Sequence, residues 1–130
     1  MPTMYARWQD VPADKWRWAN FTPAELACSC CGALLVDEEA LDKLQEARQR
    51  LGKPLRINSA YRCPKHNAKV KGSPKSQHLQ GKAFDVALST VTPLELLKAA
   101  KAAGFTGIGR YDSFVHVDTG PARTWDERTR

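Results

Sequence analysis

The stretch that decides the fold of this chain is Ser76-Gln77-His78-Leu79-Gln80-Gly81-Lys82-Ala83-Phe84-Asp85. It places a histidine seven residues before an aspartate. Its end overlaps residues 83–87, a short segment rich in strand formers. Gly81 lets the chain turn tightly before this strand, so His78 and Asp85 can converge although their spacing is not helical.

A second short stretch of strand formers, residues 114–117, contains another histidine, His116. If the two stretches pair in one sheet, Asp85 and His116 can lie next to each other on its surface. Zinc binds nitrogen, sulfur and carboxylate ligands, and a catalytic zinc site uses three protein ligands and a water. The spacing therefore predicts a zinc site made of His78, Asp85 and His116. It equally fits a surface histidine and an ordinary aspartate at a strand end, and spacing alone leaves both open.

The length and charge of the chain limit its organisation and partners. With 130 residues, a single domain over residues 1–130 is expected. The formal net charge of +6 favours polyanionic partners such as nucleic acid, an anionic membrane or an anionic cell wall. Nucleic acid is the weaker choice, because the sequence has no helix-turn-helix pattern, RNA-binding aromatic signature or finger with two cysteines and two histidines.

The hydropathy of the chain bears on its location. No stretch is apolar over the length that a membrane span needs, so no membrane insertion is expected. The N-terminal residues are mixed and lack the apolar run of a signal peptide. Synthesis in the cytoplasm is therefore expected, with any export by another route.

Helix signals occur at three places. A capping box at residues 22–25 predicts the start of a short helix. Asp37 caps a predicted helix over residues 38–51, which Gly52 ends. A second capping box, at the start of residues 92–103, predicts another helix that stops at the following glycine.

The strands are expected between and after these helices. Residues 55–58 predict a buried strand, residues 63–70 one or two helical turns, and residues 107–111 and 114–118 a hairpin. The tail from Pro121 is polar and expected to be frayed. Because strands and helices do not alternate regularly, the pattern predicts an α+β fold, with helices packed on a small, mostly antiparallel sheet.

Aromatic side chains are concentrated in the first 21 residues, at Trp8, Trp16, Trp18 and Phe21. Such rings could form a platform for sugars. Packing that ties an N-terminal arm to the body of the protein is the favoured interpretation.

Several motifs follow one another along the chain: Ile57-Asn58-Ser59-Ala60-Tyr61-Arg62, His66-Asn67, Ser76-x-His78-x-x-Gly81-x-Ala83-x-Asp85, Gly107-Ile108-Gly109 and Phe114-Val115-His116-Val117-Asp118. With this ordered set the chain resembles the zinc D-alanyl-D-alanine carboxypeptidases and their phage relatives that cleave peptidoglycan. These proteins share a fold with the murein endopeptidases and the hedgehog signalling domain. The resemblance covers residues 20–120 and leaves 121–130 as a polar tail. It implies a zinc peptidase domain with Zn²⁺ bound by His78, Asp85 and His116.

The resemblance also implies roles for residues near these ligands. Arg62 matches a family arginine at a strand end that contacts substrate or the developing oxyanion, where a fixed cation suits charge stabilisation. Ser76 matches a family serine that binds substrate, and Tyr61, beside Arg62, is assigned to the same substrate-binding group. The structural alternatives are a surface salt bridge for Arg62 and a backbone contact for Ser76.

The general base is the point at which the chain departs from the family pattern. Many relatives have an acidic residue three positions before the last zinc histidine, where this chain has Ser113. Asp118 lies two residues after His116 and shares its strand face, so we favour it as the base or as a partner that orients the ligand. Asp112, four residues before His116, is the alternative.

The chain has four cysteines: Cys28, Cys30, Cys31 and Cys63. Free thiols suit a cytoplasmic origin. A disulfide from the first three to Cys63 could form once the protein meets the periplasm. A second, structural zinc with thiolate ligands is the third interpretation, although the spacing lacks the usual paired Cys-x-x-Cys.

These features predict a zinc metallopeptidase that hydrolyses peptide bonds of peptidoglycan stem peptides or cross-links, as a D-alanyl-D-alanine carboxypeptidase or an endopeptidase. A phage endolysin is the favoured setting: a monomer made in the cytoplasm that needs a holin to reach the cell wall and periplasm. The alternative is a catalytically weak, metal-binding component that binds the cell wall or belongs to a virion, which the departure at Ser113 favours.

Overall fold

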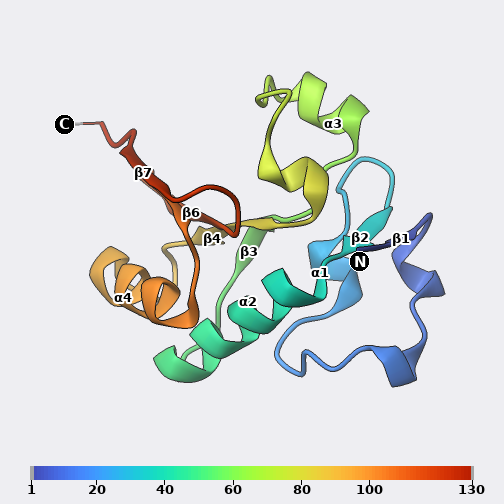
Figure 1. Ribbon diagram of the computed structural model, residues 1–130, viewed down its shortest axis with the longest axis horizontal. Coiled ribbons are helices and arrows are strands. Elements are labelled where there is room, and N and C mark those ends of the chain that lie inside the picture. The colour runs from blue at the N-terminus through green and yellow to red at the C-terminus, as the bar shows by residue number, and fades with distance from the viewer. Residues whose placement is uncertain (1, 130) are drawn as a thin grey trace.

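The computed structural model describes residues 2–129, which form helices packed against a small sheet (Figure 1). The helices are α1 (Pro23–Leu26), α2 (Glu38–Leu51), α3 (Pro64–Lys69) and α4 (Pro93–Ala103). Short 3-10 helices are formed by Trp8–Asp10, Ala13–Lys15 and Gln77–Gln80. The strands are β1 (Thr3–Tyr5), β2 (Leu34–Val36), β3 (Ile57–Ser59), β4 (Ala83–Ala87), β5 (Gly107–Arg110), β6 (Phe114–Asp118) and β7 (Arg123–Asp126).

The main sheet has five strands in the order β3-β4-β6-β5-β7. All its neighbours are antiparallel except β5 and β7, which run parallel. A separate antiparallel pair, β1 and β2, lies near the N-terminus (Figure 1). This arrangement confirms the predicted α+β class with a mostly antiparallel sheet.

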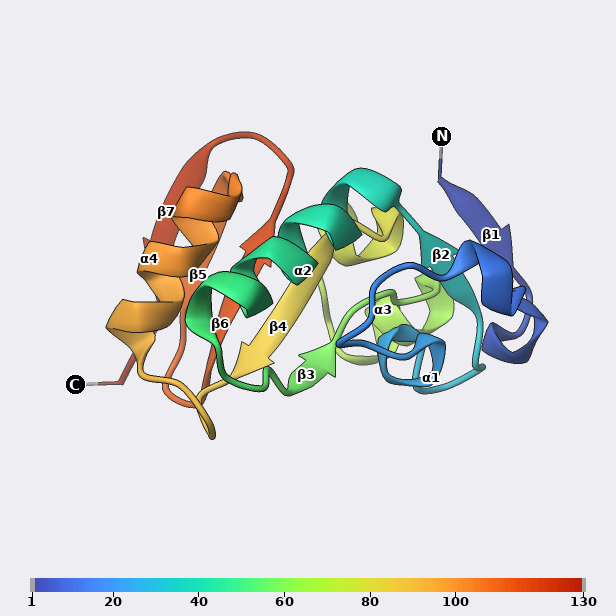
Figure 2. The ribbon, with the colours of Figure 1, turned by 90° about the horizontal axis from the view of Figure 1, so that it is seen from below.

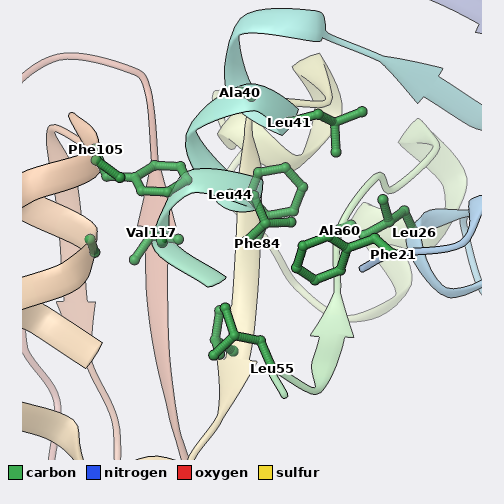
Figure 3. Packing of buried hydrophobic residues seen from close by; sticks show 14 of the residues in the cluster. Phe21, Leu26, Ala40, Leu41, Leu44, Leu55, Ala60, Phe84, Phe105 and Val117 are labelled. Carbon is green, nitrogen blue, oxygen red and sulfur yellow. The ribbon is translucent and has the colours of Figure 1, made fainter. Parts of the chain in front are cut away.

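Helices α2 and α4 lie side by side across one face of the main sheet (Figure 2). Alternate residues of the central strands enter the core on this side: Phe84 and Val86 of β4, and Val115 and Val117 of β6. Leu44 of α2 packs close to Phe84 (Figure 3). Burying each such side chain contributes about 1.5–3 kcal/mol. This alternation leaves the intervening residues of both strands on the opposite face of the sheet.

The predicted boundaries of the two long helices are confirmed. The Asp37 carboxylate accepts a hydrogen bond from the Ala40 backbone N–H at the start of α2, and Gly52 ends the helix with a φ of 65°. Thr92 and Glu95 form the predicted capping box of α4. Local capping therefore sets where both helices begin.

Two predictions for the strands were wrong. The strand predicted at residues 55–58 lies at Ile57–Ser59 instead, where Asn58 is exposed, because β3 is an edge strand and only Leu55 before it is fully buried. The tail was expected to be frayed, but residues 123–126 form β7 beside β5. The polar strand is held because Arg123 pairs with Asp118 and the Trp125 ring covers Gly109, both on the face away from the helices.

The N-terminal aromatic residues pack against the body of the protein, which is the interpretation favoured from the sequence. Trp18 and Phe21 belong to the core, and the Trp16 indole N–H donates to the Phe21 carbonyl oxygen at 2.8 Å. The β1–β2 pair next to them was not predicted, because each strand has only three residues.

Within residues 2–129, none of the helices has the length and apolar character to cross a membrane.

Candidate metal centre

The register of the central strands places two of the predicted ligands opposite each other. Asp85 of β4 pairs with His116 of β6, and His116 pairs with Gly109 of β5 on its other side. Both side chains lie on the face away from α2 and α4, since they alternate with the core residues of their strands. His116 Nδ1 lies 3.0 Å from Asp85 Oδ1.

The third predicted ligand, His78, comes from the 3-10 helix Gln77–Gln80 that directly precedes β4. Ser76 caps this helix, and its hydroxyl accepts a hydrogen bond from the His78 backbone N–H at 3.2 Å. Gly81 ends the helix with a φ of 70°, where a side chain would also press against a neighbouring backbone carbonyl. The turn brings His78 Nε2 to 3.2 Å from Asp85 Oδ1.

Each histidine is held by its second ring nitrogen. His78 Nδ1 donates to the Ala60 carbonyl oxygen at 2.6 Å. His116 Nε2 lies 2.6 Å from Asp118 Oδ2. Such outer partners fix the orientation and tautomer of a ligating histidine. They leave His78 Nε2 and His116 Nδ1 facing Asp85.

This group of atoms fits the ligand set of a catalytic zinc. One ligand atom from each of His78, Asp85 and His116 lies within 4.8 Å of the others. Two imidazole nitrogens and a carboxylate oxygen provide three ligands and leave a fourth position open to the cleft.

The groups around these ligands set their ionisation. Burial alone would raise the pKa of Asp85, but hydrogen bonds from His116 and His78 hold that pKa well below its usual range. Burial likewise opposes ionisation of Asp118, yet His116 and Arg123 hold its pKa low. These carboxylates raise the pKa of His116 against the effect of its burial. The site therefore keeps the carboxylate of Asp85 ionised beside two imidazoles, which is the charge state that a carboxylate ligand of a metal needs.

Arg62 follows β3 and lies beside these ligands. Its guanidinium donates to Asp85 Oδ2 at 3.3 Å and to Asn67 Oδ1 at 3.3 Å. It also donates to the Ser59 hydroxyl at 3.2 Å. The Arg62 backbone N–H donates to the His78 carbonyl at 3.1 Å. With its side chain 17 % exposed, Arg62 presents a fixed cation to the cleft.

The metal-ligand group opens into a cleft of about 350 Å³. Besides Arg62 and the three ligands, the cleft is lined by Lys71, Gly72, Ser73, Ser76, Tyr111, Phe114, Arg123 and Trp125. The Tyr111 and Phe114 rings stack with centroids 4.4 Å apart, and the Trp125 indole N–H donates to the Tyr111 hydroxyl at 2.8 Å. The lining thus combines cations with a group of aromatic rings.

The structure places the other predicted site residues in different ways. Ser76 lines the cleft, but Tyr61 is buried and lines a separate hollow. Asp112 lies outside the cleft, where its carboxylate accepts a hydrogen bond from the Thr129 backbone N–H at 2.9 Å. Among the residues that the structure describes, Asp85 is therefore the one carboxylate in the lining of the cleft.

Asp118 lies beneath His116 and not at the surface of the cleft. Its side chain is 0 % exposed and pairs with Arg123 at 2.8 Å. It also accepts a hydrogen bond from the Gly120 backbone N–H at 2.9 Å. This environment suits a residue that orients His116.

The sequence interpretation missed Arg123, Trp125 and Tyr111. A signal existed in the alternating glycines of β5: a side chain at Gly107 would overlap Asp118 and Arg123, and one at Gly109 would overlap Trp125. Glycine within a strand often indicates that another segment of the protein or a ligand packs closely against that position. The identity of the covering segment could not be predicted from that signal.

Comparisons with known proteins show which sequences this chain is similar to. A family model described as Peptidase M15 matches residues 19–118, which include all three candidate ligands. Peptidoglycan L,D-endopeptidase MepK of Escherichia coli strain K12 is 33 % identical over 99 residues, covering 69 % of this chain and 54 % of the relative. A protein of Haemophilus influenzae named probable peptidoglycan L,D-endopeptidase MepK is 31 % identical over 100 residues, with the same coverage. The chain spans about half the length of these relatives. The chain belongs to the Peptidase M15 family.

Proposed function

We propose that this chain is a zinc-dependent peptidase that hydrolyses peptide bonds of bacterial peptidoglycan. The observation that supports it most strongly is the convergence of His78, Asp85 and His116 at the floor of an open cleft, with the Arg62 guanidinium beside them. A three-ligand metal site suits metal-assisted hydrolysis of an amide, and a fixed cation beside it suits stabilisation of the charge that develops.

The class of bond comes from the relatives and from the charge of the cleft. The similar proteins are named peptidoglycan L,D-endopeptidases, which favours an endopeptidase over a carboxypeptidase for this chain. Stem peptides of peptidoglycan bear free carboxylates. Arg62, Lys71 and Arg123 line the cleft and could pair with such groups.

A zinc ion bound at this site would supply Lewis-acid activation of water and of the scissile carbonyl. The protein groups do the rest. Ala60 and Asp118 hold the two histidine rings in position through their outer nitrogens. Arg62 is fixed next to Asp85, where it can stabilise negative charge that develops on the substrate.

The second candidate function is a metal-binding component of a virion or of the cell wall with weak catalysis. It is favoured by the lack of an acidic residue at Ser113 and by the burial of Asp118, which is paired with Arg123. A general base must reach the proton that it removes, and Asp118 does not line the cleft.

The test is mass spectrometry of fragments released from purified peptidoglycan. Zinc-loaded protein is compared with protein treated with EDTA, with EDTA-treated protein after zinc is added back, and with His78→Ala. Glu46→Gln, an exposed change on α2 far from the cleft, serves as the matched control. We expect new peptide ends at one bond type with wild type and Glu46→Gln, and none with His78→Ala or EDTA.

Two outcomes would overturn the proposal. Zinc-loaded protein that cuts no peptidoglycan, of several chemotypes, would favour the binding component. Cleavage that persists in His78→Ala, with no zinc retained at the site, would show that the reaction occurs elsewhere.

A further inference from the structure

Four thiols from two segments that are distant in the sequence meet beside the segment that carries Arg62. Cys28, Cys30 and Cys31 lie in the loop after α1, and Cys63 immediately precedes α3 (Figure 1). Cys30 Sγ lies 3.5 Å from Cys28 Sγ and 3.4 Å from Cys63 Sγ. All four sulfurs lie within 4.8 Å of one another. We call this group the cysteine cluster.

The spacing of the sulfurs has a specific chemical meaning. Four thiolates around zinc at about 2.3 Å place neighbouring sulfurs roughly 3.8 Å apart. Two sulfur–sulfur separations in the cluster, 3.4 and 3.5 Å, are close to that value. A disulfide would join only two of the sulfurs, at about 2.0 Å, and all four cysteines are free in the structure.

The backbone around the cluster directs hydrogen-bond donors at the sulfurs. The Cys63 backbone N–H donates to Cys28 Sγ at 3.4 Å, and the His66 backbone N–H donates to Cys63 Sγ at 3.4 Å. The loop is closed by a bond from the Gly32 N–H to the Cys28 carbonyl at 2.8 Å. Such donors stabilise thiolates and orient them as ligands.

We propose that Cys28, Cys30, Cys31 and Cys63 bind a second, structural zinc ion. The site has four protein ligands and so no open position for a substrate, which distinguishes it from the site at His78, Asp85 and His116. Binding replaces the thiol protons by the metal and releases them to solvent. The net charge left on four thiolates and one dication is offset by the backbone donors to the sulfurs.

The position of the cluster gives this zinc a role in the cleft. Cys63 is the residue directly after Arg62, and Ala60, three residues before Cys63, accepts the hydrogen bond from His78 Nδ1. The Tyr61 N–H donates to the Leu26 carbonyl at 3.3 Å, so the same segment is already joined to the end of α1. The structural zinc therefore fixes the segment that positions both Arg62 and His78.

The experiment measures metal content and cobalt spectra and needs no substrate. We expect native mass spectrometry and elemental analysis to find two zinc ions per chain in wild type and one in His78→Ala/His116→Ala. That double variant isolates the cysteine cluster. Reloaded with cobalt, it should show thiolate-to-cobalt charge-transfer absorption, which ligation by histidine and aspartate alone does not give.

The matched variants are Cys30→Ser and Cys31→His. Cys30→Ser should lose the charge-transfer absorption and one zinc, whereas Cys31→His keeps a zinc ligand and should retain the metal with an altered spectrum. If Cys30→Ser fails to fold, the cobalt spectra of wild type and of His78→Ala/His116→Ala still show whether the cysteine cluster binds metal. One zinc in wild type, with no thiolate–cobalt absorption and four titratable thiols, would refute the second site. An intact mass that is lower by two hydrogen atoms would show that two of the cysteines form a disulfide instead of binding zinc.

This result is independent of the proposed peptidase activity. A chain with two zinc ions and no hydrolysis would retain the structural site and reject the enzyme. A chain with one zinc ion that cleaves peptidoglycan would do the reverse.

Discussion

Asp85 and His116 face each other across β4 and β6, and His116 Nδ1 lies 3.0 Å from Asp85 Oδ1. The same carboxylate oxygen lies 3.2 Å from His78 Nε2. One oxygen of Asp85, Oδ1, thus contacts both histidines, while the other, Oδ2, accepts a hydrogen bond from Arg62. The strand register, more than any loop, sets the geometry of the candidate metal centre, and rigid elements hold such sites better than loops do.

Asp85→Asn should remove the metal from this centre while leaving the fold intact, since the two side chains have nearly the same shape. The neutral amide is a poorer ligand and no longer offsets the charge of a cation. Losing a group that only hydrogen-bonds to a metal ligand lowers activity by roughly 10–100-fold. We expect Asp85→Asn, which changes a ligand itself, to lower kcat/KM by more than that. Elemental analysis and circular dichroism check the result, with Asp42→Asn, an exposed aspartate on α2, as control. Retention of both zinc and activity would exclude Asp85 as a ligand.

Asp118→Asn separates an orienting residue from a general base. Because Asp118 is buried and lies 2.6 Å from His116 Nε2, we expect zinc affinity to fall by roughly 10–100-fold, with kcat largely restored at saturating zinc. A general base would behave in the opposite way, with unchanged zinc affinity and a loss of kcat that added zinc does not restore. Competition with a chromophoric chelator and assays over a range of zinc concentrations give the two quantities.

Arg62→Lys should lower kcat/KM by roughly tenfold or more. The guanidinium contacts Ser59, Asn67 and Asp85 through different nitrogens, and one ammonium group cannot reproduce that fork. Zinc content should not change, because Arg62 is not a ligand. The matched control is Arg48→Lys on α2. Steady-state kinetics that match wild type would assign Arg62 a purely structural role.

The sequence was sufficient to predict the centre of the fold. Strand formers alternate in residues 83–87 and 114–118, and one face of each strand is apolar, so the pairing of Asp85 with His116 follows from burial of the other face. Caps at Asp37 and Thr92 likewise set the starts of α2 and α4.

The sequence was insufficient where partners are distant and polar. Strand β7 has no apolar face, and its place beside β5 depends on the pair Arg123–Asp118 and on Trp125 covering Gly109. Asp112 and Asp118 were both compatible with a strand face shared with His116, but the turn after β5 carries Asp112 out of the cleft. Such choices depend on tertiary contacts that local patterns do not encode.

Asp118 also makes the metal-free protein sensitive to acid. Its pKa is held below the ordinary value of 3.8 by His116 and Arg123, against the effect of its burial. A depressed pKa means that its stabilisation is complete above that ordinary value and is lost as the pH falls through the lower, folded value. In Arg123→Gln the pKa of Asp118 should be lowered less, because the charged hydrogen-bond donor at position 123 is lost.

The free energy of unfolding should therefore differ between wild type and Arg123→Gln by about 1 kcal/mol at neutral pH, since the Arg123 side chain is 40 % exposed while its partner is buried. The difference should shrink as the pH is lowered below the ordinary pKa of an aspartate. Urea unfolding in EDTA, at neutral and acidic pH, measures it, with Arg7→Gln, at an exposed arginine, as control. A difference that is constant with pH would show that Arg123 acts through packing alone.

Gly109→Ala should displace β7 from the main sheet. The added methyl group would overlap the Trp125 ring, whose indole N–H holds the Tyr111 hydroxyl and whose centroid lies 5.2 Å from that of His116. Overpacking of this kind destabilises a protein by about 1–3 kcal/mol. The aromatic side of the cleft should open, so kcat/KM should fall as well.

Trp125→Ala separates these two effects, because it removes the ring without an overlap. In the double variant Gly109→Ala/Trp125→Ala the methyl group has space, so its destabilisation should be smaller than the sum of the two single changes. Activity in the double variant should remain low, since the ring that covers this side of the cleft is absent. Additive losses of stability would mean that Gly109 is required for the strand itself and not for the close approach of Trp125.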